Sequence, residues 1–229
     1  MIPSRDPAAR TAGWLLLVTA ILTVVAVIGR VGATDLTALA QSLAAIGANR
    51  TLFGIGGAAR FVSGLTLFAG ACFLLRTWIM RRRLGSRPVP VLLGVSGVAT
   101  ALSGAIGVAL SIAAPEPSTV DGLSPVAPTT TLLLTLFWIT GRVGFSLAGL
   151  ALIAAGLRQW RAGGFMRPVA PVSAILGAAM QLIWIDAARE AHYITGPAFV
   201  LWLAAIGVML VTGRVEKRFA ALVEEESAG

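Results

Sequence analysis

Few residues of this chain could do acid–base or metal chemistry. Asp186, Glu190 and His192 form a short polar stretch between two apolar runs. Acid–base catalysis needs at least two titratable groups that converge on one substrate, and the single histidine cannot by itself supply a zinc or bis-histidine haem site. Cys72 is the only cysteine, which excludes an intramolecular disulfide and a cysteine metal cluster. No HExxH, GxSxG or phosphate-loop pattern occurs in a usable context, so we predict no catalytic residue, no metal site and no cofactor.

Two arginines stand inside apolar runs, where a charge is costly. Arg60 lies sixteen residues before Arg76, and Arg142 lies sixteen residues before Arg158. Sixteen helical residues rise about 24 Å, so both arginines are predicted in the outer part of a membrane. An arginine at the bilayer centre costs at least ~2.5 kcal/mol, and less if it snorkels outward.

Asp186 and Glu190 are the acidic side chains that could offset this cost. Asp186 is nineteen residues beyond Arg167 on a helix running in the opposite sense, which brings it to a similar level. We treat Arg60, Arg142, Asp186 and Glu190 as candidates for either a structural ion pair or an outward-facing polar pocket. Snorkelling of the arginines without partners is the third interpretation.

The elements that must position these residues are membrane helices. Hydrophobic residues make up 57% of the 229, charged residues only 12%, and the mean hydropathy is +0.86. A soluble domain carries about a quarter of charged residues, and an apolar run of about twenty residues spans the roughly 30 Å hydrocarbon core as a helix. We therefore predict an all-α polytopic bundle, one transmembrane domain over 1–229, with six spans at 13–30, 51–76, 89–113, 130–158, 168–186 and 197–213.

Two further segments are predicted as amphipathic rather than spanning. Leu36, Leu39, Leu43 and Ile46 repeat at helical spacing, which predicts a helix over 35–47 that lies on the membrane surface. Val215, Phe219, Leu222 and Val223 give the tail, 214–229, a similar face. The first span could instead be a signal peptide cleaved near Val31-Gly32-Ala33, but the preceding Arg30 argues against cleavage.

The third span is predicted to be the central and most tightly packed helix. Gly97, Ala101, Ala105 and Ala109 form a series of small residues at four-residue spacing, which lets neighbouring backbones approach closely. Its larger residues, including Val95, Val98 and Leu102, fall on another stripe. The remaining scattered glycines are interpreted as packing residues.

Spacing also suggests an internal repeat of spans two and three in spans four and five. Arg60, Arg76 and Trp78 recur as Arg142, Arg158 and Trp160, each 82 residues later. Arg87-Pro88-Val89 recurs as Arg167-Pro168-Val169, 80 residues later. Many transporters contain such repeats; the alternative is coincidence among apolar helices of similar composition.

The net charge of +8 does not indicate nucleic acid, because the basic residues stand at the ends of apolar runs. Thirteen of the eighteen basic residues lie before span one, in the connections after spans two and four, and in the tail. Only three lie in the other connections. The positive-inside rule then places both termini in the cytoplasm. The arginines are expected to contact anionic lipid of a bacterial-type inner membrane.

The last third of the chain resembles a known family. The stretches that carry the resemblance are Gly156–Arg161, Phe165–Pro168 and Gly196–Leu203, together with Ala9–Gly13 near the start. They look like an uncharacterised family of six-span bacterial integral membrane proteins, catalogued as a domain of unknown function. The resemblance implies the topology and no activity, cofactor or site residues.

Three functions from different classes follow. The first is binding or carrying a lipid or a small amphipathic or anionic ligand through the outward-facing pocket. The second is a non-catalytic accessory or scaffold subunit of a larger membrane complex with other membrane subunits, in which the charged positions are structural. An intramembrane enzyme ranks last, because only Asp186, Glu190 and His192 could take part in its chemistry.

The topology can be tested with single cysteines introduced by Ser118→Cys and by Ser86→Cys in a Cys72→Ala background. An impermeant thiol reagent added to intact cells should label the cysteine at position 118 and spare that at 86. Labelling of position 86 alone would mean that the topology is inverted.

Overall fold

The computed structural model describes residues 6–30, 39–114, 128–185, 188 and 191–228. No strand occurs among them. Six helical segments in these ranges are long and apolar enough to cross a membrane, which supports a multi-pass helical membrane protein. The helices are α1 (Pro7–Arg30), α2 (Leu39–Ala48), α3 (Arg50–Leu75), α4 (Trp78–Arg81), α5 (Pro88–Ala113), α6 (Pro128–Ala162), α7 (Val169–Met180), α8 (His192–Val211) and α9 (Arg214–Ala228), with 3-10 turns η2 (Gly164–Met166) and η3 (Gln181–Trp184) at the two ends of α7.

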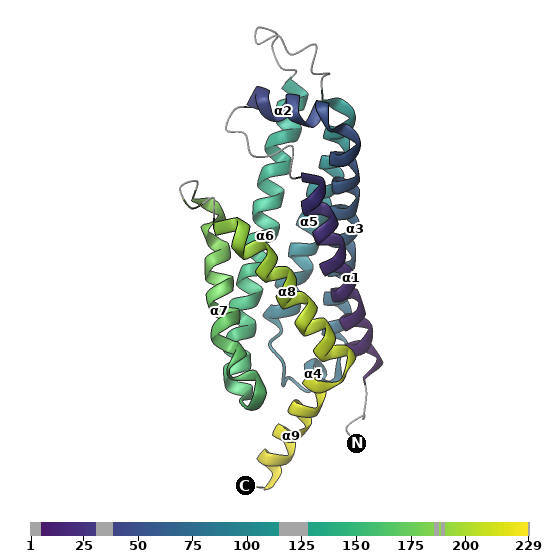
Figure 1. The fold of residues 1–229 in the computed structure, drawn as a ribbon. Coiled ribbons are helices and arrows are strands. Elements are labelled where there is room, and N and C mark those ends of the chain that lie inside the picture. Colours follow the sequence, from purple (N-terminus) through teal and green to yellow (C-terminus); the bar gives the residue numbers. More distant parts are fainter. Residues whose placement is uncertain (1–5, 31–38, 115–127, 186–187, 189–190, 229) are drawn as a thin grey trace.

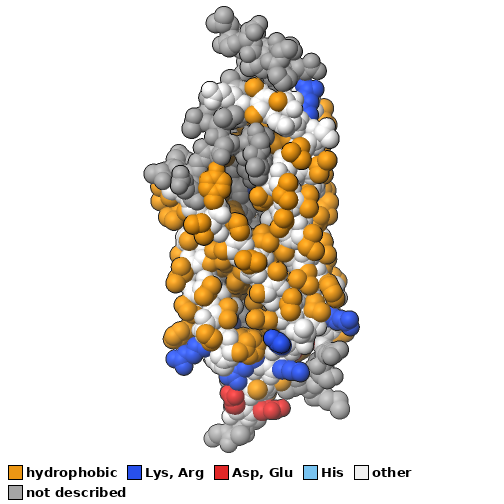
Figure 2. Space-filling model, viewed as in Figure 1, with side chains coloured by type: hydrophobic (Ala, Val, Ile, Leu, Met, Phe, Trp, Pro, Cys, Tyr) orange, Lys and Arg blue, Asp and Glu red, His pale blue; other side chains and the backbone are white. Residues whose placement is uncertain are grey.

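The six long helices form a closed ring. Going round the ring, α1 packs on α3, α3 on α5, α5 on α6, and α6 on α7. Helix α8 completes the ring by crossing α1 and touching α7 (Figure 1). Both described ends of the chain lie at the same end of the bundle, beside α4 and α9 (Figure 1). We call this the basic end, because Lys and Arg side chains gather there (Figure 2). The opposite end, where α2 lies across the bundle, is the α2 end.

Apolar side chains cover the middle of the molecule between these ends (Figure 2). Ile21, Ile175 and Leu201 are 65%, 70% and 71% exposed. An apolar surface of this extent is rare on a monomer that faces water and marks an interaction or membrane surface. On six helices long and apolar enough to cross a membrane, this belt is the surface that meets lipid.

Paired glycines set the distances between helices. Gly64 of α3 meets Gly97 of α5, and Gly149 of α6 meets Gly177 of α7. A Cβ placed on Gly64 would lie 2.3 Å from the Ala101 nitrogen, closer than any real contact. The interpretation of these glycines as packing residues is therefore confirmed.

Hydrogen bonds between helices support the same interfaces. Thr19 of α1 pairs with Thr66 of α3 at 2.8 Å between hydroxyl oxygens, and Ser96 of α5 donates to the Gly144 carbonyl of α6 at 2.7 Å. In α8, Trp202 donates its Nε1–H to the Ser173 hydroxyl of α7 at 2.9 Å. These bonds give the Thr19, Thr66 and Ser96 hydroxyls and the Trp202 indole nitrogen a partner inside an apolar interface, where an unpaired polar group is costly.

Several predicted boundaries differ from the observed ones. The first span begins at Pro7 rather than 13, and α6 covers 128–162 rather than 130–158. Span six was predicted to start near Pro197, in the first helical turn, but α8 begins at His192 and contains Pro197 in its second turn. Proline cannot donate an amide hydrogen to the preceding turn, yet only one bond is lost, so the helix continues through it.

The two amphipathic segments pack on the protein itself. In α2, Leu43 and Ile46 are 1% and 0% exposed and join a cluster with Phe53 and Leu110. The predicted start of this helix, at 35, lies outside the described residues. In the tail, Phe219 is 5% exposed because the apolar face of α9 contacts α4 and the α6–α7 connection. Neither apolar face is therefore spread on the membrane surface.

The small face of α5 is the predicted one at Gly97 and Ala101 but not at Ala105. Ala105 is exposed, whereas Gly97, Ala101 and Gly104 are buried against α3. At 3.6 residues per turn, each four-residue step turns about 40° away from the starting face. Alternating steps of four and three stay in contact, which is why Gly104 replaces Ala105. The prediction that this span is the most tightly packed holds otherwise. In its most apolar stretch of 18 residues, 44% of the residues are buried, a larger share than in the other described spans.

Both hairpins of the suggested repeat form, with α3 on α5 and α6 on α7. The glycines of the second helices, Gly97 and Gly177, are 80 residues apart, as predicted. Those of the first helices, Gly64 and Gly149, are 85 apart rather than 82. The spacing of these contacting glycines thus differs by three residues from the spacing of the arginines. The repeat stays a prediction.

Ala101→Leu and Ala105→Leu make a matched test of this packing. Overpacking a filled interface costs about 1–3 kcal/mol, so Ala101→Leu should lower the melting temperature in detergent, because residue 101 contacts Gly64. Ala105→Leu, on the exposed face, should melt like the wild type. Equal melting temperatures for the two variants would contradict the observed face.

Candidate functional site

The two predicted arginines lie at one level of the bundle, on α3 and α6. The Arg60 guanidinium lies 5.8 Å from the ring centre of Phe137, and a Cβ on Gly141 would come within 2.9 Å of its Nη2. Arg142, the next residue of α6, has its guanidinium 5.6 Å from the Trp138 ring centre. Aromatic faces stabilise both cations, and Arg60 reaches the backbone of the helix that carries Arg142.

The surroundings of Arg60 contain little space. A narrow crevice is lined by Phe53, Gly56, Gly57, Arg60 and Phe137, and it has no room for a water molecule. Asp186 and Glu190 lie outside the described residues, as does the side chain of His192. The pairing of either arginine with Asp186 or Glu190 therefore stays a prediction.

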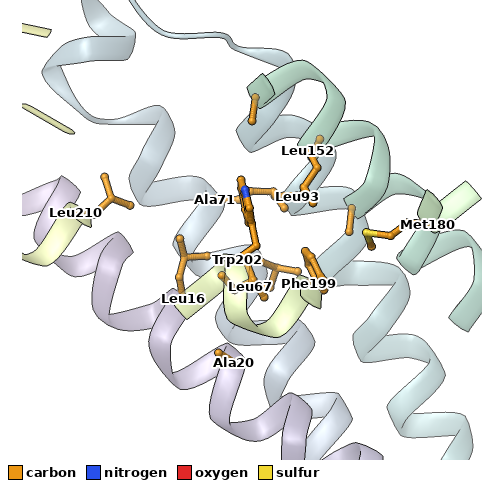
Figure 3. Close-up of a cluster of buried hydrophobic side chains, with 14 of the residues drawn as sticks. Leu16, Ala20, Leu67, Ala71, Leu93, Leu152, Met180, Phe199, Trp202 and Leu210 are labelled. Atoms are coloured by element: carbon orange, nitrogen blue, oxygen red, sulfur yellow. The ribbon is translucent and has the colours of Figure 1, made fainter. Parts of the chain in front are cut away.

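The centre of the ring is filled by a core to which all six spans contribute. Leu16, Leu93 and Trp202 point into it together with Leu67, Leu152 and Met180 (Figure 3). Trp202 is 8% exposed and Leu93 1%. This core separates the α2 end from the basic end.

A cavity of about 150 Å³ lies next to this core on the side of the basic end. Leu16, Leu93 and Trp202 belong to both the core and the cavity wall. Much of the wall comes from the last or first turns of the helices, for example Leu74, Val89, Val169, Leu210 and Val215. A cavity of this volume holds a benzene-sized apolar group in an engineered protein.

Few polar groups line the cavity, and two are consecutive on the last turns of α6. Arg158 and Gln159 both border it, and the Arg158 guanidinium lies 5.4 Å from the ring centre of Phe219. Thr77 also lines it, but its hydroxyl already donates to the Leu74 carbonyl at 2.8 Å. A cation and an amide at the edge of an apolar wall suit an amphipathic ligand.

Helix α9 covers part of the cavity at the basic end. It leaves α8 through Gly213, whose φ of 70° lies in the left-handed region that favours glycine. Val215 and Phe219 of α9 line the cavity. Arg218 holds the helix in place by donating its Nε–H to the Ala162 carbonyl at 3.0 Å.

Two buried carboxylates join α9 to the start of the chain. The Asp6 amide donates to Glu216 Oε1 at 2.7 Å, and Asp6 Oδ2 accepts from the Trp78 amide at 2.7 Å. Asp6 and Glu216 are each 5% exposed. Asp6 also caps α1 by accepting from the Ala8 amide at 3.0 Å, and a carboxylate at a helix start is favoured by the helix dipole.

The sequence patterns placed Arg158 at the end of a span and in the suggested repeat. They did not single out Gln159, Asp6 or Glu216 as site residues. Asp6 before Pro7 is an N-cap pattern that could have been found locally. Glu216 is 210 residues from its partner, and no local pattern links the two.

A comparison with known proteins found no match: no family model, no curated protein and no solved structure is similar to this chain. The family resemblance of the sequence stays a prediction.

Proposed function

We propose that this protein binds or carries a small anionic amphiphile such as a lipid, with the apolar part of the ligand in the cavity of the basic end. The observation that supports it best is that all six spans and α9 contribute to one apolar cavity with Arg158 at its edge. An apolar ligand part gains about 25 cal/mol per Å² of surface removed from water.

The head group of the ligand is assigned to Arg158. Its guanidinium fork binds carboxylate or phosphate through two parallel hydrogen bonds. The crevice beside Arg60 offers no comparable volume, so we assign the ligand to the basic end rather than to the outward-facing pocket. With both termini in the cytoplasm, as the positive-inside rule indicates, the ligand would enter from the cytoplasmic leaflet.

Octyl phosphate is a suitable probe, and its binding to the purified protein in a maltoside detergent can be measured by native mass spectrometry. Wild type should bind one molecule. Ala155→Leu, which fills the cavity, should abolish binding while the protein stays folded. Arg158→Ala should weaken binding about tenfold or more, because a hydrogen bond to a charged group contributes about 1.5–3 kcal/mol.

Arg161→Ala is the matched control, since Arg161 is exposed on the same helix three residues further. It should bind like wild type. A wild type that binds no octyl phosphate, or that binds it unchanged after Ala155→Leu, would rule out this cavity as the site. The accessory-subunit alternative would then be favoured.

A further inference from the structure

We infer that the ligand is a bilayer lipid that inserts one hydrocarbon chain sideways, through an opening between α7 and α8 at the basic end. This inference rests on the proposed function, since it concerns the same cavity. It names the source of the ligand, the membrane rather than water, and the route by which its chain enters.

Helices α7 and α8 meet beside the core and separate toward the basic end. The Trp202 indole reaches from α8 to the Ser173 hydroxyl of α7 at 2.9 Å, and both side chains are buried. Beyond Trp202, α8 crosses to α1, where a Cβ on Gly207 would come within 2.9 Å of the α1 backbone (Figure 1). The start of α7 instead packs on α6, since a Cβ on Gly156 would lie 2.8 Å from the Ala170 carbonyl oxygen.

The cavity lies between these separating ends. Phe165 and Val169 line it from the side of α7, and Ile206 and Met209 line it from the side of α8. Phe165 is 43% exposed, and the other three residues are half-buried. Residues that border both the cavity and the outer surface stand at its mouth. We call these four residues the lateral opening.

The surface around the lateral opening is apolar. On the same two helices, Val172 of α7 and Val208 of α8 are 59% and 49% exposed. Exposed apolar residues of this kind form the belt that meets lipid (Figure 2). A hydrocarbon chain that enters here passes from lipid to an apolar wall, so none of its apolar surface is exposed to water on the way.

The lateral opening also lies close to the level of lipid head groups. Arg167 is exposed in the chain between Phe165 and Val169, and its guanidinium lies 4.8 Å from the ring centre of Trp160. Arginine and tryptophan side chains of this kind mark the boundary between hydrocarbon and head groups. A lipid can therefore keep its head group at this boundary while one chain bends into the cavity.

The size of the cavity limits what can enter it. Its volume of about 150 Å³ is similar to that of an engineered apolar cavity that binds benzene, so it takes roughly six carbon atoms of one chain. The rest of the lipid stays in the bilayer. This volume excludes two chains side by side.

The test measures how a thiol in the cavity wall is reached in the full-length protein, reconstituted in nanodiscs of phosphatidylcholine. Ala155→Cys in a Cys72→Ala background places the thiol in the wall. Butyl methanethiosulfonate dissolves in the bilayer, whereas sulfonatoethyl methanethiosulfonate has the same reactive group but is an anion that stays in water. Mass spectrometry of the intact protein should show modification of position 155 by the butyl reagent and none by the anion. Ala151→Cys, buried on the same helix but not part of the wall, should react with neither.

Two tryptophan substitutions in the cavity wall separate the possible routes. Val169→Trp fills the lateral opening and should slow modification by the butyl reagent about tenfold or more. Ser86→Trp places the same ring in the part of the wall that precedes α5, and the rate should stay unchanged. Phe165→Ala removes a ring from the lateral opening and should raise the rate, which keeps the route testable if Val169→Trp does not fold.

The outcomes distinguish this inference from the proposed function. Modification by the anion at the same rate, or slowing by Ser86→Trp instead of Val169→Trp, would mean that the cavity opens to water and would overturn the lateral route. No modification of position 155, or equal rates at positions 151 and 155, would overturn it as well. Binding of octyl phosphate in any of these cases would leave the proposed function in place. A protein that reacts through the lateral opening but binds no octyl phosphate would instead keep the opening and reject the proposed ligand.

Discussion

The close approach of helix backbones at paired glycines is the constraint on which the rest of the structure depends. Apolar helices in a bilayer gain little by hiding apolar surface from lipid, so their association relies on van der Waals contact and interhelical hydrogen bonds. The pairs are Gly13–Gly207, Gly29–Gly56, Gly64–Gly97 and Gly149–Gly177, at four different helix interfaces. A Cβ on any of these glycines would lie 2.3 to 3.1 Å from the backbone of the partner helix, so a larger residue would push the helices apart.

The cavity follows from where these contacts end. Around the middle of the ring, large side chains such as Trp202 and Leu93 fill the space that the crossing helices leave (Figure 3). Toward the basic end the helices terminate, and their last turns surround a space that no side chain fills. Small residues such as Ala155 border this space. Its position beside Arg158 and Gln159 combines apolar walls with two polar groups, the arrangement that an amphiphile requires.

Polar contacts at the basic end hold together segments from the whole length of the chain. The Asp6 carboxylate accepts a hydrogen bond from the Trp78 amide, and the Asp6 amide donates one to Glu216. The residue before α1, the α3–α5 connection and α9 therefore share one buried cluster. A buried carboxylate is tolerated only where hydrogen bonds replace its lost hydration. Because Glu216 is also on α9, the same cluster keeps Phe219 against the cavity.

The sequence by itself determined the helical class, the six candidate spans and the separate stripe of larger residues on α5, whose Val95, Val98 and Leu102 are about half exposed in the structure. These properties depend on the length and periodicity of single segments, which a local pattern records. The tertiary structure alone decided that Gly104 rather than Ala105 contacts α3, that α2 and α9 pack on the protein, and that the cavity lies at the basic end. Asp6 and Glu216 are 210 residues apart, and the cavity takes residues from every span. Contacts of this kind arise from the mutual packing of distant segments, and no single segment contains the information that specifies them.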